Sequence, residues 1–391
     1  MRLFSVFHSA RARALLVGSV VTALAVVIGC GGGGGATSVT DTGSTATNTG
    51  STATNTGSTA TNTGSTATNT GSTATNTGST ATNTGNGVLP PNVILFSQND
   101  ASDANYSIQA LSPTAKTPTA ILSNIPPTIN PIVLNPAVKN QYIAAVQANS
   151  TALYGIYATT GATATGAKTI ASPAFALVYT ISVSNSGSSI VFTGSDSTGQ
   201  TDSLYYVPSS GGTPTILDSG EACQIGPDND SIVYSKFVGL NTQLFIYSLS
   251  KKTLTQMTSD VTDHDMPQFS KDGTKIVFQK GYQHAGGYED YGIAIMTVST
   301  KTEIDLPNAG QINETGPSLN GTSGSVSFIA SDGIPYAIAT QTATGAAGST
   351  YSALYSNSGL NPSGSTYWSS STGRGIARVS YGVARGRKRK Q

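Results

Sequence analysis

Short apolar strings recur along the chain at intervals of 42 to 50 residues, and this period constrains the fold more than any other feature. The strings are VILF, IAAV, SIVF, SIVY, KIVF, SVSF and GIAR, which end at Phe96, Val146, Phe192, Tyr234, Phe278, Phe328 and Arg378. A unit of this length is typical of the four-stranded blade of a β-propeller. Since a single blade cannot bury both faces of its sheet, the blades must stack around an axis.

The clearest unit begins at residue 265 with DMPQFSKDGTKIVF. PQFS predicts the innermost strand, Lys271 to Thr274 a tight hairpin, and KIVFQK the second strand; YGIAIMTVS and KTEIDLP follow as the third and fourth strands. Gly273 tolerates a positive φ and Asp272 can bond to the local backbone. We therefore expect this pair to shape a turn, with no part in chemistry.

The two ends of the repeat region are incomplete in complementary ways. The first unit begins directly at its second strand, NVILFS, and the C-terminal TYWSSSTGRGIARVSY reads as a first and second strand without a third. Pairing of the C-terminal strands with the N-terminal blade would close the ring and leave no exposed sheet edge. The prediction is an all-β fold with six blades, seven being the alternative, and with Trp368 on the inner closing strand, where it packs between blades.

The N-terminus has the layout of an export signal. Residues 1–13 carry three arginines and no acid, residues 14–29 form an apolar run, and Cys30 follows directly. The segment Val27-Ile28-Gly29-Cys30 resembles the bacterial lipoprotein processing motif, which implies lipidation of Cys30. An ordinary secretory signal and an uncleaved membrane anchor are the alternatives.

Four segments follow from these patterns: a signal peptide at 1–29, a stalk at 30–87, a propeller at 88–382 and a basic tail at 383–391. The stalk contains the unit GSTATNT six times without error, and it has almost no large apolar side chain, so disorder is expected. Cys223 is the only other cysteine and is predicted to be a packed residue.

Charge is distributed unevenly along the chain. Residues 31–373 hold nineteen acidic residues and ten lysines, whereas the last eighteen residues carry seven basic groups. A mildly acidic body with one basic tail does not indicate a nucleic-acid-binding domain.

The unit that contains residues 265–278 resembles the β-propeller repeat of TolB-like periplasmic proteins. The matching residues are Asp265, Pro267, Phe269, Ser270, Asp272, Gly273, Lys275, Ile276 and Phe278, with Ile293, Ile295 and Met296 on the third strand. The resemblance covers residues 93–382 and is strongest over 264–308. TolB-like proteins usually carry an α/β domain before the propeller, and this chain has the stalk there.

The segment Asp263-His264-Asp265 is the candidate binding site, because it leads into the inner strand of the best-preserved unit. His284, Glu289 and Asp290 follow in a Gly-rich connection, and such residues could bind a divalent metal. We expect no metal or other cofactor, since the connection is predicted to lie on the rim opposite to Asp263.

Few features of the sequence indicate catalysis. No Gly-x-Ser-x-Gly elbow occurs, and only three histidines are present. Paired carboxylates could still serve a glycosidase, and the acids near predicted strand ends are Asp196, Asp202, Asp260, Asp263 and Glu314, each with an ordinary turn role.

The expected function is therefore that of a monomeric, non-catalytic lipoprotein of the bacterial cell envelope, facing the periplasm or the exterior. It would bind an envelope protein or polysaccharide through the funnel face of the propeller and a membrane through its lipid. An exported hydrolase or lyase acting on glycans or peptides is the alternative, and a surface-display protein without a defined ligand is a third possibility.

Overall fold

The computed structural model describes most of the chain from residue 93 onward. The described residues are 93–99, 105–114, 117–138, 141–148, 151–161, 166–283, 289–307, 313–320, 324–331, 336–343, 352–357, 360, 366–368 and 378–379, with the backbone of seven short strands between residues 38 and 83. These residues form strands and turns, and they include no helix long and apolar enough to span a membrane. The signal segment, Cys30 and the basic tail lie outside the described residues.

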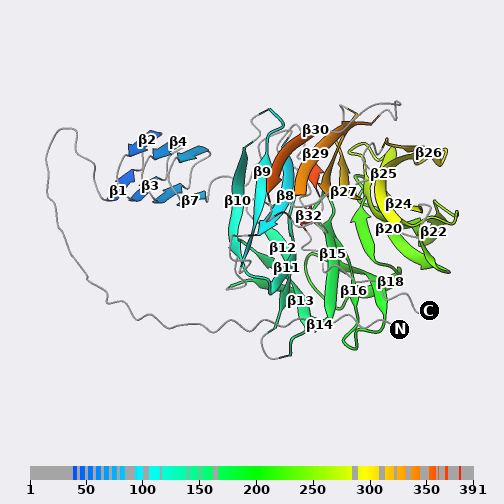
Figure 1. Ribbon diagram of the computed structural model, residues 1–391. Helices are drawn as coiled ribbons and strands as arrows, with labels where there is room; N and C mark the ends of the chain where they lie inside the picture. Colours follow the sequence, from blue (N-terminus) through cyan, green and yellow to red (C-terminus); the bar gives the residue numbers. More distant parts are fainter. Residues whose placement is uncertain are drawn as a thin grey trace, which may run out of the picture.

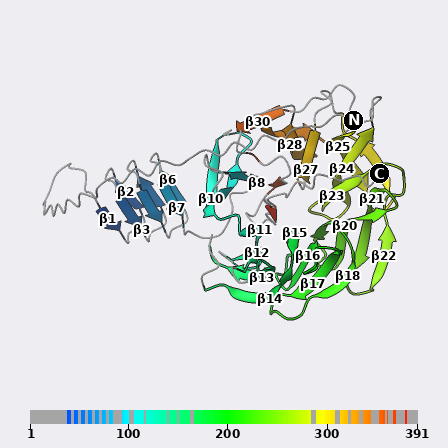
Figure 2. The same cartoon turned by 60° about the horizontal axis from the view of Figure 1, so that its bottom comes forward.

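Six antiparallel sheets stand around a common axis as the blades of a propeller (Figures 1 and 2). From inside outward, the first three blades are β31 (Tyr367–Trp368), β8 (Ile94–Asn99), β9 (Tyr106–Leu111) and β10 (Pro118–Ile125); β11 (Ile129–Leu134), β12 (Tyr142–Gln147), β13 (Tyr154–Thr159) and β14 (Lys168–Phe175); and β15 (Leu177–Val183), β16 (Ser189–Ser195), β17 (Asp202–Pro208) and β18 (Thr215–Ser219).

The remaining three blades follow the same order. They are β19 (Ala222–Ile225), β20 (Ser231–Val238), β21 (Asn241–Ser248) and β22 (Thr253–Gln256); β23 (His264–Phe269), β24 (Lys275–Gln283), β25 (Glu289–Thr297) and β26 (Thr302–Asp305); and β27 (Asn313–Leu319), β28 (Ser325–Ser331), β29 (Tyr336–Thr342) and β30 (Ser352–Asn357). The predicted all-β, six-bladed propeller is confirmed.

The first six periodic strings are the second strands of the six blades, β8, β12, β16, β20, β24 and β28. Their aromatic end residues are completely buried: Phe96, Phe192, Tyr234, Phe278 and Phe328. The seventh string breaks the rule, because Arg378 lies in β32 (Arg378–Val379), which pairs with β11 on the inner side of the second blade. The prediction of GIAR as the second strand of a blade is wrong, since β32 pairs with the innermost strand of the second blade.

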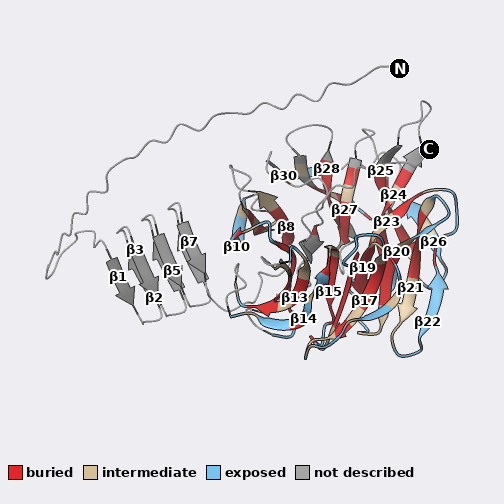
Figure 3. Cartoon of the chain, turned by 90° about the horizontal axis from the view of Figure 1, so that it is seen from below, coloured by how far each residue is buried: buried red, intermediate tan, exposed pale blue. Residues whose placement is uncertain are grey.

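The core lies between neighbouring blades. Phe192 of β16 stacks on Tyr205 with 4.9 Å between ring centroids, and Phe175 of the preceding blade meets both rings edge-on at 5.0 Å. Figure 3 shows buried residues along the inner strands and exposed residues at outer strands such as β14 and β22. Cys223 is fully buried with its sulfur 3.3 Å from the hydroxyl oxygen of Thr180, as a packed residue should be.

The ring closes through β31, which pairs antiparallel with β8. Tyr367 lies opposite Leu95, and Trp368 lies opposite Ile94, so the first blade takes its innermost strand from the C-terminal part of the chain. This confirms the predicted closure and the place of Trp368 on the inner strand.

Thr366, immediately before β31, fastens the closing strand to the sixth blade. Its backbone N–H donates to the carbonyl oxygen of Gly316 at 2.9 Å, and its buried hydroxyl lies 2.9 Å from the carbonyl oxygen of Ser327. Thr366 thus links the closing strand of the first blade to the sixth blade.

The alternation of strand directions gives the propeller two rims. On one rim lie the hairpins between second and third strands and the connections from each fourth strand to the next blade; we call it the connection rim. On the other lie the turns between first and second strands and between third and fourth strands. The strand β8 also begins there, so the chain enters the propeller at this rim, which we call the stalk rim.

Asp272 and Gly273 form the predicted turn between β23 and β24. The Asp272 carboxylate accepts hydrogen bonds from the Ser270 hydroxyl at 2.6 Å and from the Thr274 N–H at 3.1 Å, and Gly273 has a φ of 72°. These hydrogen bonds lower the pKa of Asp272, which is the behaviour of a turn residue held as a carboxylate. The geometric role is confirmed.

Replacement of Gly273 by Ala should destabilise the propeller by about 1–2 kcal/mol. A Cβ at this position would lie 3.1 Å from Cγ of Pro227 in the neighbouring blade, in addition to the strain of its positive φ. Gly239→Ala is the matched control, because Gly239 has a φ of 66° and no atom within 4 Å of the added Cβ. Thermal unfolding of both variants should show the larger loss for Gly273→Ala; equal losses would mean that the contact with Pro227 has no cost.

The stalk contains seven short strands. The four-residue strands β1 (Ser38–Asp41), β2 (Thr45–Asn48), β3 (Thr52–Asn55), β4 (Thr59–Asn62), β5 (Thr66–Asn69), β6 (Thr73–Asn76) and β7 (Thr80–Asn83) form two parallel sheets, in the orders β1-β3-β5-β7 and β2-β4-β6. Each strand from β2 onward is one TATN unit. Identical units let these strands pair in register, with Thr52 opposite Thr66, which pairs backbone groups without large apolar side chains.

Candidate functional site

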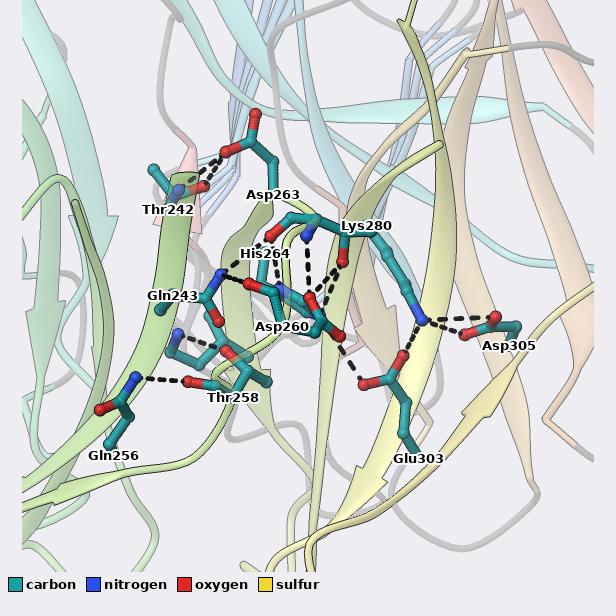
Figure 4. A network of polar contacts seen from close by, with 12 residues as sticks. Thr242, Gln243, Gln256, Thr258, Asp260, Asp263, His264, Lys280, Glu303 and Asp305 are labelled. Carbon is teal, nitrogen blue, oxygen red and sulfur yellow. Dashed lines mark hydrogen bonds and ion pairs between the residues drawn. The ribbon is translucent and has the colours of Figure 1, made fainter. Parts of the chain in front are cut away.

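The predicted site residues Asp263, His264 and Asp265 lie at the connection rim, where the chain passes from the fourth blade into β23. The structure brings Asp263 and His264 together with Thr242 of β21, Lys280 of β24, and Glu303 and Asp305 of β26 in one network of polar contacts (Figure 4). Asp265 lies beside this network and contacts Ser235 of the fourth blade. Asp263 and His264 are buried and Asp265 is half-buried.

Asp263 joins two blades. Its carboxylate accepts hydrogen bonds from the N–H and the hydroxyl of Thr242, at 2.7 and 3.1 Å, and its own carbonyl oxygen accepts the N–H of Gly281 at 2.8 Å. Thr242 belongs to the fourth blade and Gly281 to the fifth. The side chain of Asp263 therefore fastens the connection between these blades.

His264 is completely buried between strands, and its ring centroid lies 5.4 Å from that of Phe278. Nδ1 lies 3.1 Å from the carbonyl oxygen of Thr262. Nε2 lies 3.6 Å from a carboxylate oxygen of Asp260 and 3.7 Å from one of Glu303. A ring enclosed in this way supports the surrounding loop and is shielded from solvent.

Lys280 completes the network from the second strand of the blade. Its ammonium group forms ion pairs with Glu303 and, at 3.0 Å, with Asp305. Burial opposes ionisation of Glu303, but the adjacent His264 ring and the ammonium group of Lys280 outweigh it and lower the pKa of Glu303 to about 2. Burial and the neighbouring Glu303 raise the pKa of Asp305.

The lowered pKa of Glu303 predicts a loss of stability in acid. The folded-state pKa lies below the usual value of 4.5, so the stabilisation is present above pH 4.5 and is lost as the pH falls toward 2. We expect the loss to reach at most about 3 kcal/mol, since the raised pKa of Asp305 offsets part of it. Denaturant unfolding between pH 5 and 2 measures this; Glu303→Gln should flatten the dependence, and an unchanged slope in that variant would contradict the assignment.

Asp265 contacts the fourth blade. Its carboxylate accepts hydrogen bonds from the Ser235 hydroxyl at 2.6 Å and from the Met266 N–H at 2.7 Å. Met266 has a φ of 50°, and the pairing of β23 with β24 shifts register between Asp265 and Gln268. Asp265 thus stabilises a β-bulge at the start of the inner strand.

The sequence-based argument that placed the connection after β24 on the opposite rim is wrong. His264 lies opposite Lys280, and Gln283 lies opposite Glu289, so the end of β24 and the beginning of β23 meet at the same rim. The reason is that the first and second strands of a blade are antiparallel. His284 itself lies outside the described residues, as do the side chains of Glu289 and Asp290, and among the described residues no three His, Cys, Asp or Glu side chains converge as a metal site.

Three of the other predicted carboxylates accept hydrogen bonds from nearby side chains. Asp196 accepts hydrogen bonds from Thr198, Asp202 from Ser195 and Tyr179, and Asp260 from Thr262, while Glu314 is buried in β27. Asp196 and Asp202 flank the hairpin between β16 and β17 of the third blade, whereas Asp260 precedes the fifth blade and Glu314 lies in the sixth.

Sequence reasoning missed an apolar surface beside the network. Leu240 is 94% exposed and Val261 is 83% exposed, with Phe237 and Val238 about half exposed; we call these four residues the rim patch. Gln243 ties its two segments together, because its side-chain amide donates to the carbonyl oxygens of Asp260 and Thr262. The signal was present as FVGL, an apolar string at a hairpin tip where polar turn residues are usual.

The architecture assigns the chain to the class of six-bladed β-propellers. Solved structures with a similar fold include TolB from Acinetobacter baumannii, with a TM-score of 0.51 and 16% sequence identity over 71% of this chain and 66% of that chain. They also include a putative TolB from Agrobacterium tumefaciens, with a TM-score of 0.52 and 14% identity over 75% of this chain and 98% of that chain. The predicted likeness to TolB-like propellers is confirmed at the level of the fold.

A puromycin-hydrolyzing peptidase from Mycobacterium tuberculosis also matches, with a TM-score of 0.46 and 11% identity over 68% of this chain and 44% of that chain. No protein-family model and no curated protein sequence matches the chain.

Proposed function

We propose that this chain is a non-catalytic lipoprotein of the cell envelope whose propeller binds a protein partner through the rim patch. The observation that carries the proposal is the exposure of Leu240 and Val261, at 94% and 83%, on neighbouring segments of the connection rim. Large apolar side chains exposed on neighbouring segments mark an interaction site more often than scattered ones do. Aliphatic side chains favour a protein over an envelope polysaccharide, which would be bound through aromatic rings and hydrogen bonds.

The polar network beside the patch supports a binding role over a catalytic one. Asp263 and Asp265 are engaged by Thr242 and Ser235 of the neighbouring blade, which fixes the connection that carries Val261. A rigid rim loses little conformational entropy on binding. The enzymatic alternative, a hydrolase or lyase, requires that Asp263→Asn and Asp265→Asn abolish turnover of a glycan or peptide and leave thermal stability unchanged.

The proposal is tested by crosslinking in the native envelope and identification of the attached protein. Leu240→Asp with Val261→Asp should abolish the crosslinked species, because a charge in the patch would have to be buried by the partner. Ile216→Asp is the control, since Ile216 is an exposed aliphatic residue (63%) on the outer strand β18. Loss of the species in the control, or its persistence in the double variant, would refute the patch as the binding surface.

The lipid anchor is a separate part of the proposal. It rests on the apolar run at 14–29, on Cys30 directly behind it, and on the resemblance to TolB-like periplasmic proteins. Tethering would raise the local concentration of the propeller near its partner. Uptake of a labelled fatty acid by the natural chain and release of Cys30→Ser to the aqueous fraction is the expected outcome; no change in either would refute the anchor. We further propose that the propeller is a monomer and does not bind nucleic acid.

A further inference from the structure

The lysines of the propeller gather on one rim. Six of the eight lysines in the described residues lie at turns of the stalk rim or next to them, and all six are exposed: Lys168, Lys251, Lys252, Lys271, Lys275 and Lys301. The other two, Lys236 and Lys280, lie toward the connection rim and form ion pairs, with Asp218 at 2.9 Å and with Glu303 and Asp305.

The acidic residues are distributed in the opposite sense. The described acids at the turns of the stalk rim are Asp228, Asp230 and Asp272, and each binds the N–H groups or hydroxyls of its own or the adjacent turn. Glu303 lies one residue inside this rim, near the start of β26, and forms an ion pair with Lys280. The connection rim holds the larger set: Asp196, Asp202, Glu221, Asp260, Asp263, Asp265 and Asp305. The described part of the propeller therefore has a cationic rim and an anionic rim.

The point where the chain enters the propeller predicts which of the two rims would face a membrane. Since β8 begins at the stalk rim, the chain that precedes it leaves the propeller from the cationic side. The same chain leads back to Cys30 and to the apolar run at 14–29. An anchor at that end would turn the lysines toward the membrane and the acidic rim away from it.

We propose that the stalk rim docks on an anionic phospholipid surface. Lysine ammonium groups are point charges that attract phosphate headgroups, and lysines near a membrane surface contribute independently to binding. Repulsion of the acidic rim by the same headgroups sets the orientation, so that the rim patch faces away from the bilayer. The inference uses the anchored placement proposed above but is independent of which protein the rim patch binds.

The test uses the full chain with Cys30→Ser and sedimentation with vesicles of phosphatidylcholine alone or in equal parts with phosphatidylglycerol. Replacement of Lys251, Lys271 and Lys275 by Gln should weaken binding to the anionic vesicles by about tenfold or more and leave binding to phosphatidylcholine unchanged. The apolar run is common to all variants, so differences between them report the rim.

The control places the same charge change on the other rim. Gln200→Glu, Thr201→Glu and Ser219→Glu alter the net charge equally at exposed positions of the connection rim and should reduce binding far less. Equal losses in the two variants would show that net charge alone acts and would overturn the proposal. Unchanged binding by the lysine variant, or binding of the natural chain to soluble heparin fragments but not to the vesicles, would overturn it as well.

Discussion

Truncation after Asn357 should abolish cooperative folding of the propeller. The truncation removes β31, and with it the partner of Leu95 and Ile94 on the innermost position of the first blade. Both residues are completely buried, so the loss exposes the apolar inner face of β8 and opens a sheet edge toward the axis. We expect no sharp thermal transition in the truncated chain, as followed by circular dichroism.

A graded series checks that closure itself is responsible. Removal of residues 383–391 alone should leave the transition unchanged, because β31 and β32 remain. Thr366→Val should have an intermediate effect of about 1–2 kcal/mol, since it removes the hydroxyl next to the carbonyl oxygen of Ser327 and leaves the shape of the side chain intact. A sharp, natural-like transition after truncation at Asn357 would show that the ring does not depend on its C-terminal strand.

Asp263→Ala should destabilise the propeller by about 3 kcal/mol, which corresponds to a fall in melting temperature of about 6–10 °C. The carboxylate is buried and accepts both the N–H and the hydroxyl of Thr242, so its removal leaves buried donors without their acceptor. Asp263→Asn is the matched control, because the amide oxygen can still accept one hydrogen bond, and it should cost markedly less. Equal and small losses in both variants would mean that Asp263 does not join the blades.

The fold was predictable because one buried aromatic residue repeats in the second strand of five blades. Phe96, Phe192, Tyr234, Phe278 and Phe328 keep their places because each contributes to the core that packs between neighbouring blades. The period therefore predicted the length of a blade, and the missing first strand of the first unit indicated that the C-terminal part of the chain closes the ring.

The same reasoning failed where pairing partners lie far apart in the sequence. Arg378 belongs to a string of the right length and spacing. Its strand nevertheless pairs with β11, the innermost of the four strands of the second blade, which lies more than 240 residues earlier in the chain. The strands of the stalk have a different origin. Composition reports how little apolar surface TATN can bury, whereas the parallel register comes from the exact identity of the units.

The sequence places the candidate residues at a rim but does not indicate their contacts. The order of Asp263, His264 and Asp265 before an inner strand indicates a rim, but it contains no information on Thr242 or Glu303, which come from another blade and another strand. Burial of His264 is a result of tertiary packing, and the sequence around it is polar. The rim patch, in contrast, could have been predicted from the apolar string at a hairpin tip.

A photo-crosslinking side chain at position 240 or at position 216, in otherwise natural chains expressed in the native envelope, tests the central claim most directly. Both positions are exposed and aliphatic, but Leu240 lies in the rim patch and Ile216 lies on an outer strand. The proposal that the connection rim binds a protein predicts one discrete adduct from position 240 and none from position 216. An adduct from position 216 alone, or the same adducts from both positions, would contradict it.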